Sequence, residues 1–138
     1  MDSFTFSRIP ELVFGMGKFS VLPDLIGRYG KRIILVTGES SFARTSQASI
    51  LFDYLEKNGF RWSVVKIPGE PSANEIDAAT NKFRGELPDV VVAIGGGSVI
   101  DAGKAISAML VSPEHIEYYL EGVGNHPSTG DKVPFIAV

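Results

Sequence analysis

The sequence predicts an α/β fold: a doubly wound, mostly parallel sheet with helices on both faces. Segments of strand and helix character alternate along the 138 residues. The strand segments are continuous apolar runs, which is typical of parallel strands buried on both faces. Because crossovers between parallel strands are right-handed, the doubly wound arrangement is the simplest topology.

The first part of the chain predicts a strand, a helix and a second strand. The short apolar run at 12–14 is a strand candidate followed by a glycine-containing turn. Residues 19–28 place leucine and isoleucine side chains on one helical face, and Pro23 falls in the first turn, where proline is tolerated. Residues 32–37 form a buried strand that ends at Gly38.

The middle of the chain repeats this alternation. An amphipathic helix is expected over 47–58, with Gly59 as its stop, and a strand over 61–67. Pro68 and Gly69 end that strand. A further helix is expected over 72–84, capped by the Ser72 hydroxyl and ended by a glycine.

The last part predicts a strand over 90–94, a helix over 98–111, a loop-rich segment over 121–132 and a final strand over 133–138. The final strand is apolar and has no turn or tail after it. We therefore expect the chain to be cut from a longer protein. The alternative is a natural terminal strand docked into the sheet.

Composition predicts a single cytoplasmic domain of ordinary globular character. The chain is 44% hydrophobic and 21% charged, with a formal net charge of -3. Scattered basic residues and a negative charge argue against nucleic acid as a partner. No apolar run is long enough to span a membrane, and the N-terminus lacks the features of a signal peptide. The absence of cysteine fits a reducing compartment.

The segment after the strand at 90–94 carries the clearest functional signal. Gly95, Gly96 and Gly97 follow the strand directly, and Ser98 opens the next helix. Glycines at such a turn let a ligand approach the backbone, while unpaired N–H groups and the helix dipole favour an anion. This pattern predicts a phosphate site. The alternative is a tight left-handed turn without a ligand.

Two common phosphate motifs do not fit. A P-loop needs a hydroxyl residue after Gly103-Lys104, but Ala105 stands there. The segment 15–20 nearly matches the dinucleotide fingerprint, but Ser20 replaces its last glycine and the strand before it is very short. We interpret 15–20 as a tight turn between an edge strand and a helix.

A third motif, Gly-Gly-Gly-Ser-x-x-Asp-x-x-Lys, matches residues 95–104 throughout. Here the chain resembles the N-terminal, Rossmann-like nucleotide-binding domain of the iron-containing (group III) alcohol dehydrogenases, within the dehydroquinate synthase-like superfamily. The resemblance covers essentially the whole chain in the family's order. It is supported by three further segments: 14–18, 35–38 and 69–72.

The resemblance implies roles for the residues of this motif. Gly95 to Ser98 would hold the cofactor pyrophosphate through backbone N–H groups, with the Ser98 hydroxyl as a further donor. Asp101 and Lys104, on one helical face, would point into a cleft near the nicotinamide ribose and the substrate. The alternatives are that Asp101 only stabilises the helix N-terminus and that Lys104 is solvated.

The residues after the second predicted strand bear on cofactor choice. Family members that prefer NAD often carry an acid at the position of Gly38. A glycine there, with the hydroxyls of Ser40 and Ser41, favours NADP(H) over NAD(H). Glu39 is the counter-argument, because it could bond a ribose 2′-hydroxyl.

The resemblance also implies what the chain lacks. In the family, Fe²⁺ or Zn²⁺ in an all-helical C-terminal domain polarises the alcohol oxygen during hydride transfer. We expect residues 1–138 to be the dinucleotide-binding domain alone, without catalytic residues or metal ligands, and inactive by itself. His115 and His126 are interpreted as surface residues.

The expected partners are a nicotinamide dinucleotide and a small alcohol or aldehyde. If the chain is complete, an apolar face would remain uncovered and a homodimer is expected. Other interpretations remain open. They are a polyol or glycerol-phosphate dehydrogenase, a dehydroquinate synthase-like lyase, or a non-catalytic nucleotide-binding module.

Overall fold

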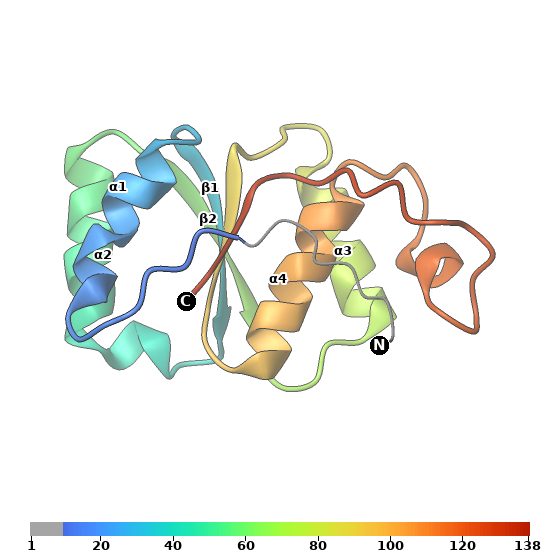
Figure 1. Ribbon diagram of the computed structural model, residues 1–138, viewed down its shortest axis with the longest axis horizontal. Helices are drawn as coiled ribbons and strands as arrows, with labels where there is room; N and C mark the ends of the chain where they lie inside the picture. The colour runs from blue at the N-terminus through green and yellow to red at the C-terminus, as the bar shows by residue number, and fades with distance from the viewer. Residues whose placement is uncertain (1–9) are drawn as a thin grey trace, which may run out of the picture.

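The computed structural model describes residues 10–138, which form a parallel sheet between two layers of helices (Figure 1). Its strands are β1 (Arg32–Gly38), β2 (Arg61–Ile67), β3 (Val90–Ile94) and β4 (Phe135–Ala137). Their order in the sheet is β2-β1-β3-β4, and every pairing is parallel. The predicted fold class is confirmed.

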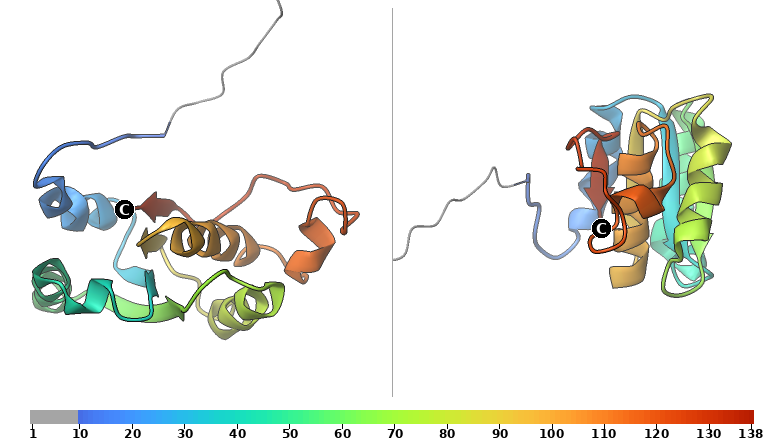
Figure 2. Two further views of the ribbon diagram at one scale, coloured as in Figure 1. Left: turned by 90° about the horizontal axis from the view of Figure 1, so that it is seen from below. Right: turned by 90° about the vertical axis from the view of Figure 1, so that its right-hand side faces the viewer.

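The helices cover both faces of the sheet, as Figure 2 shows. The α-helices are α1 (Leu22–Gly27), α2 (Ser46–Lys57), α3 (Ala73–Phe83) and α4 (Gly97–Met109), and the short 3-10 helices are η1 (Lys18–Val21), η2 (Phe42–Arg44) and η3 (Ile116–Tyr119). Helices α1 and α2 lie on one face, and α3 and α4 lie on the other. Within residues 10–138, each helix is too short or too polar to cross a lipid bilayer.

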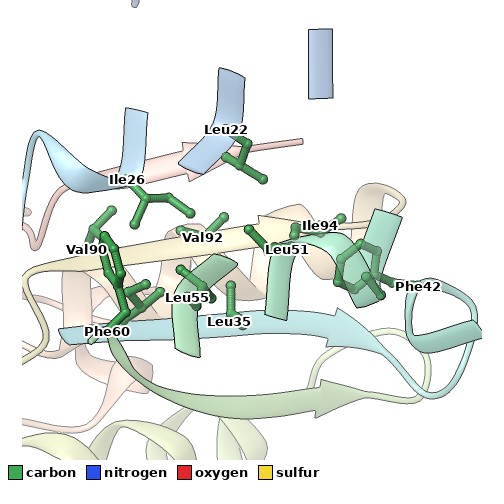
Figure 3. Close-up of a cluster of buried hydrophobic side chains, with 12 residues drawn as sticks. Leu22, Ile26, Leu35, Phe42, Leu51, Leu55, Phe60, Val90, Val92 and Ile94 are labelled. Carbon is green, nitrogen blue, oxygen red and sulfur yellow. The ribbon is translucent and has the colours of Figure 1, made fainter. Parts of the chain in front are cut away.

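The core consists of two apolar clusters separated by the sheet. Figure 3 shows the first, between the sheet and the helices α1 and α2: Leu22, Ile26, Ile33, Leu35, Phe42, Ala48, Leu51, Leu55, Phe60, Val90, Val92 and Ile94. The second lies under α3 and α4: Ile34, Val36, Ile67, Ile76, Val91, Ala93, Val99, Ala102, Ile106, Met109, Leu110 and Val133. Successive residues of β1 and β3 point to opposite clusters, which explains why both strands are apolar throughout.

The prediction of a strand at 12–14 is wrong. Residues 10–14 have no regular secondary structure, and the side chains of Leu12 and Phe14 are 82% and 90% exposed. None of the described strands pairs with this segment. A turn is present at the start of 15–20, where Gly15 and Gly17 have positive φ, and it leads into η1. The edge strand expected before this turn is absent.

Local sequence signals explain the remaining helix boundaries. Pro23 lies in the first turn of α1, and Gly59, with φ 69°, follows the end of α2. The Ser72 hydroxyl caps α3, and the Glu75 side chain accepts a bond from the Ser72 N–H in return. The 121–132 segment contains turns and coil but no helix or strand, as expected.

Candidate cofactor-binding site

The expected site residues lie at the carboxyl edge of the sheet, which is the lower edge in Figure 1. Thr37 pairs with Ile94 in the sheet register, so the ends of β1 and β3 lie side by side. The chain leaves β1 through α2 on one face and reaches β3 through α3 on the other. Ligands of open α/β sheets bind at such a switch point.

The glycine segment joins β3 to α4 in an extended conformation. The Gly95 N–H donates to the Val138 carbonyl at 3.0 Å, which continues the sheet by one bond. This N–H is therefore already paired and, contrary to the expectation for Gly95, is not free for a phosphate. A Cβ on Gly95 would meet Val99 at 3.0 Å, so packing favours glycine there. Gly96 has φ -78° and Gly97 is the first residue of α4, so neither adopts the left-handed turn.

Gly96 and Gly97 leave open space in front of the helix. A Cβ added to either residue would meet no atom within 4 Å. Backbone conformation and packing within the described chain therefore do not require glycine at these positions. A ligand that approaches the main chain closely would require it.

The N-terminus of α4 offers unpaired donors to such a ligand. Gly96 provides no side-chain cap, and the first turn of α4 contains no acidic residue. Among the hydrogen bonds of residues 10–138, none has the N–H of Gly96, Gly97 or Ser98 as donor. Together with the helix dipole, these groups fit a diphosphate.

The Ser98 hydroxyl already has a partner that the sequence alone did not reveal. It donates to Glu70 Oε2 at 3.1 Å, and Glu70 belongs to the loop between β2 and α3. In the sequence, Glu70 stands out only as part of the segment 69–72. A contact over 28 residues has no local periodicity that would reveal it.

Asp101 and Lys104 share one exposed face of α4, as their spacing predicted. The Lys104 ammonium lies 3.3 Å from Asp101 Oδ1, and both side chains are more than 60% exposed. The pair is therefore free to rearrange, because exposed ion pairs are weak. Contact of either side chain with a cofactor remains a prediction.

Gly38, Ser40 and Ser41 lie at the end of β1 and in the loop after it, and β1 is the neighbour of β3 in the sheet. Gly38 is the last residue of β1, and a Cβ there would lie 3.1 Å from Ser41 Oγ. Glu39 is exposed, and Ser40 is half-buried. The buried Phe42 anchors the end of this loop in the core.

A sequence model described as iron-containing alcohol dehydrogenase matches residues 10–138. The chain belongs to the iron-containing alcohol dehydrogenase family. This family assignment agrees with the resemblance carried by residues 95–104.

Curated relatives include two butanol dehydrogenases. The chain is 31% identical to a probable NADH-dependent butanol dehydrogenase 1 of Bacillus subtilis, with 78% of this chain and 28% of the relative covered. It is 28% identical to an NADPH-dependent butanol dehydrogenase of Clostridium saccharobutylicum, with 100% of this chain and 34% of the relative covered. The chain thus spans about a third of the length of these relatives.

Solved structures of the family share the fold. An NADH-dependent butanol dehydrogenase A from Thermotoga maritima superposes with a TM-score of 0.86 at 24% identity, covering 99% of this chain and 34% of that one. A sulfoacetaldehyde reductase from Bifidobacterium kashiwanohense, solved in complex with NAD+, gives 0.71 at 25% identity, covering 89% and 32%.

The family name implies iron, but the described residues do not fit a metal centre. Among residues 10–138, no group of three His, Cys, Asp or Glu side chains lies close enough together to hold a metal ion. His115 and His126 are exposed, as expected for surface residues. His115 Nδ1 lies 2.9 Å from Asp77 Oδ2, while His126 pairs with Glu114 and stacks on Tyr118. Both imidazoles therefore act as partners of single carboxylates rather than as members of a ligand set.

A cleft of about 170 Å³ lies at the C-terminal end of α4, opposite to the glycine segment. No sequence pattern predicted it. Its lining comes from α4, from η3 and from the loops on either side of η3: Ala108, Met109, Val111, Ser112, Pro113, Tyr119, Ser128, Thr129 and Asp131. The cleft lacks the open helix N-terminus that suits a diphosphate.

Proposed function

We propose that this chain is the cofactor-binding part of an NAD(P)-dependent alcohol dehydrogenase. Its site would hold the diphosphate of a nicotinamide dinucleotide at the N-terminus of α4. Two observations at Gly96 and Gly97 together carry the proposal. Their N–H groups are unpaired, and a side chain at either position would occupy space that is open in the structure. The family assignment supports it.

Backbone groups and side chains of the site have separate tasks in this proposal. The N–H groups of Gly96, Gly97 and Ser98 bind the diphosphate oxygens, and the α4 dipole offsets their charge. Asp101 and Lys104 lie further along the exposed face of α4, where their side chains would orient the nicotinamide half. The bound nicotinamide ring supplies the hydride acceptor or donor for an alcohol or aldehyde.

For the adenosine half we propose a preference for NADP(H). Gly38 places no carboxylate at the end of β1, and Ser40 and Ser41 offer hydroxyl donors to a 2′-phosphate. Relatives are named for both cofactors: the Bacillus subtilis protein for NADH and the Clostridium saccharobutylicum protein for NADPH. The exposed Glu39 is the residue that would instead favour NADH.

The complete reaction requires more than this chain in our proposal. Residues 1–138 act as the dinucleotide-binding domain, and a helical part outside them supplies the metal ligands. The chain's coverage of about a third of its relatives supports this division. The 138-residue chain should then bind cofactor but not oxidise alcohols.

Cofactor titration of the 138-residue chain tests the proposal. NADPH and NADH are each titrated while nicotinamide fluorescence is followed, and NADPH should bind more tightly. Gly97→Val places a branched side chain in the open space before α4 and should weaken binding by roughly tenfold or more. Gly85→Val is the matched control, because a Cβ there also meets no atom within 4 Å.

Three results would contradict the proposal at different points. If the chain and its Gly97→Val variant bind the cofactor equally well, the diphosphate does not bind at the α4 N-terminus. Tighter binding of NADH than of NADPH would contradict the cofactor preference alone. Metal-dependent alcohol oxidation by the 138-residue chain would contradict the division into two parts.

A further inference from the structure

Glu70 brings a carboxylate to the first turn of α4 from another part of the chain. Its Oε2 accepts the Ser98 hydroxyl at 3.1 Å across 28 residues. Helix α4 itself has no acidic residue in its first turn and no side-chain cap. Glu70 therefore supplies the negative group that helix N-termini favour and that α4 lacks.

Glu70 is exposed, and the residues that follow it restrict its backbone. Pro71 follows it and restricts the Glu70 backbone to extended conformations. Ser72 then forms the reciprocal capping box with Glu75, whose Oε2 accepts the Ser72 N–H at 2.9 Å. The Glu75 carboxylate already caps α3, so Glu70 is the nearby acid that is available to the N-terminus of α4.

The charged side chains of α4 do not neutralise the negative charge of Glu70. Lys104 is the closest cation along that helix, and its ammonium is paired with Asp101 at 3.3 Å. That pair carries no net charge. An anion bound at Gly96 and Gly97 would therefore experience the Glu70 carboxylate as a like charge, only partly screened by water.

We propose that Glu70 is a specificity-determining residue that selects against highly charged phosphates at the α4 N-terminus. The inference rests on the proposed function. A dinucleotide carries one negative charge on each phosphate of its diphosphate bridge. ADP, which has the same adenosine half, carries a further charge on its terminal phosphate. Repulsion by Glu70 should therefore penalise ADP more strongly than NADH.

Binding of NADH and ADP to the 138-residue chain and its Glu70→Gln variant tests this role. Glutamine keeps the size and an acceptor for Ser98 but removes the charge. NADH binding should tighten roughly threefold and ADP binding roughly tenfold, so that discrimination between them falls about threefold. Glu56→Gln is the matched control: Glu56 is an exposed glutamate near the end of α2, at the opposite edge of the sheet.

The possible outcomes separate the two proposals. If NADH binds the unaltered chain and Glu70→Gln changes neither ligand, or weakens both, the role of Glu70 is overturned while the proposed function stands. If neither ligand binds either chain, the proposed function is overturned, and the role of Glu70 with it. Ser98→Ala provides a second check, because removal of the hydroxyl that holds Glu70 should reduce the effect of Glu70→Gln.

Discussion

At the scale of single residues, Asp89 ties the start of β1 to the start of β3. Its Oδ2 accepts the N–H groups of Lys31 and Arg32 at 2.9 Å, and its Oδ1 lies 2.9 Å from the Arg32 guanidinium. A Cβ on Gly30 would overlap this carboxylate, which explains the glycine. The bonds from Arg32 hold the pKa of Asp89 below its usual value of 3.8.

Asp89→Asn should therefore destabilise the fold in a pH-dependent way. A lowered pKa means that the charge stabilises the folded state above pH 3.8, and that this contribution is lost as the pH falls through the lower value. At pH 7 we expect a loss of roughly 1 kcal/mol, because the pair is partly exposed to water. Urea unfolding at pH 7 and at pH 3 measures it.

The comparison with an exposed aspartate makes the result specific. Asp53→Asn, on the exposed side of α2, should leave the free energy of unfolding nearly unchanged at both pH values. The free energy of unfolding of Asp89→Asn should approach that of the unaltered chain as the pH is lowered. An equal loss at pH 7 and at pH 3 would contradict the role of the Asp89 charge.

At the scale of elements, Gly103 sets how closely α4 packs on the sheet. A Cβ at this position would lie 2.7 Å from the Ala93 Cβ of β3 and 2.8 Å from the Phe135 ring of β4. Both neighbours are held in the sheet. Helix α4 can therefore approach its strands only with glycine here.

Gly103→Ala should destabilise the chain even though alanine is the better helix former. The helix preference is worth about 1 kcal/mol in favour of alanine. Overpacking typically costs about 1 to 3 kcal/mol, and both nearest atoms here lie below 3 Å. We expect the clash to outweigh the helix preference, so that urea unfolding shows a lower free energy of unfolding. Gly85→Ala, which meets open space, should show none, and a gain in Gly103→Ala would contradict the close packing.

The elements also show which information a sequence carries locally. The strands at 61–67 and 90–94 and the Ser72 cap coincide with the prediction, because periodicity and capping are short-range properties. The run at 12–14 has strand composition but no partner strand in the described part of the chain, and pairing depends on distant residues.

The same distinction applies to the candidate site. The sequence predicts the glycine segment because its residues are consecutive, so the whole motif can be recognised within one short stretch of the chain. The contact between Glu70 and Ser98 joins residues 28 apart, and that between Asp77 and His115 joins residues 38 apart. Only the folded sheet brings these side chains together, so single-sequence patterns could not reveal them.

At the scale of the whole molecule, the sheet order places the loops after β1, β2 and β3 at one edge. Helix α4 runs from this edge to the opposite one, where the cleft near Ser112 and Tyr119 lies. The two ends of α4 therefore offer two candidate places for a small molecule. The central claim is that the dinucleotide binds at the glycine end.

NMR titration of the isotope-labelled chain with NADPH tests that claim most directly. Residue-resolved amide signals report which backbone groups the ligand touches. The account predicts that the amides of Gly96, Gly97 and Ser98 shift most, followed by those of the loop after Gly38. Shifts concentrated around Ser112 and Tyr119, with the glycine amides unchanged, would contradict it.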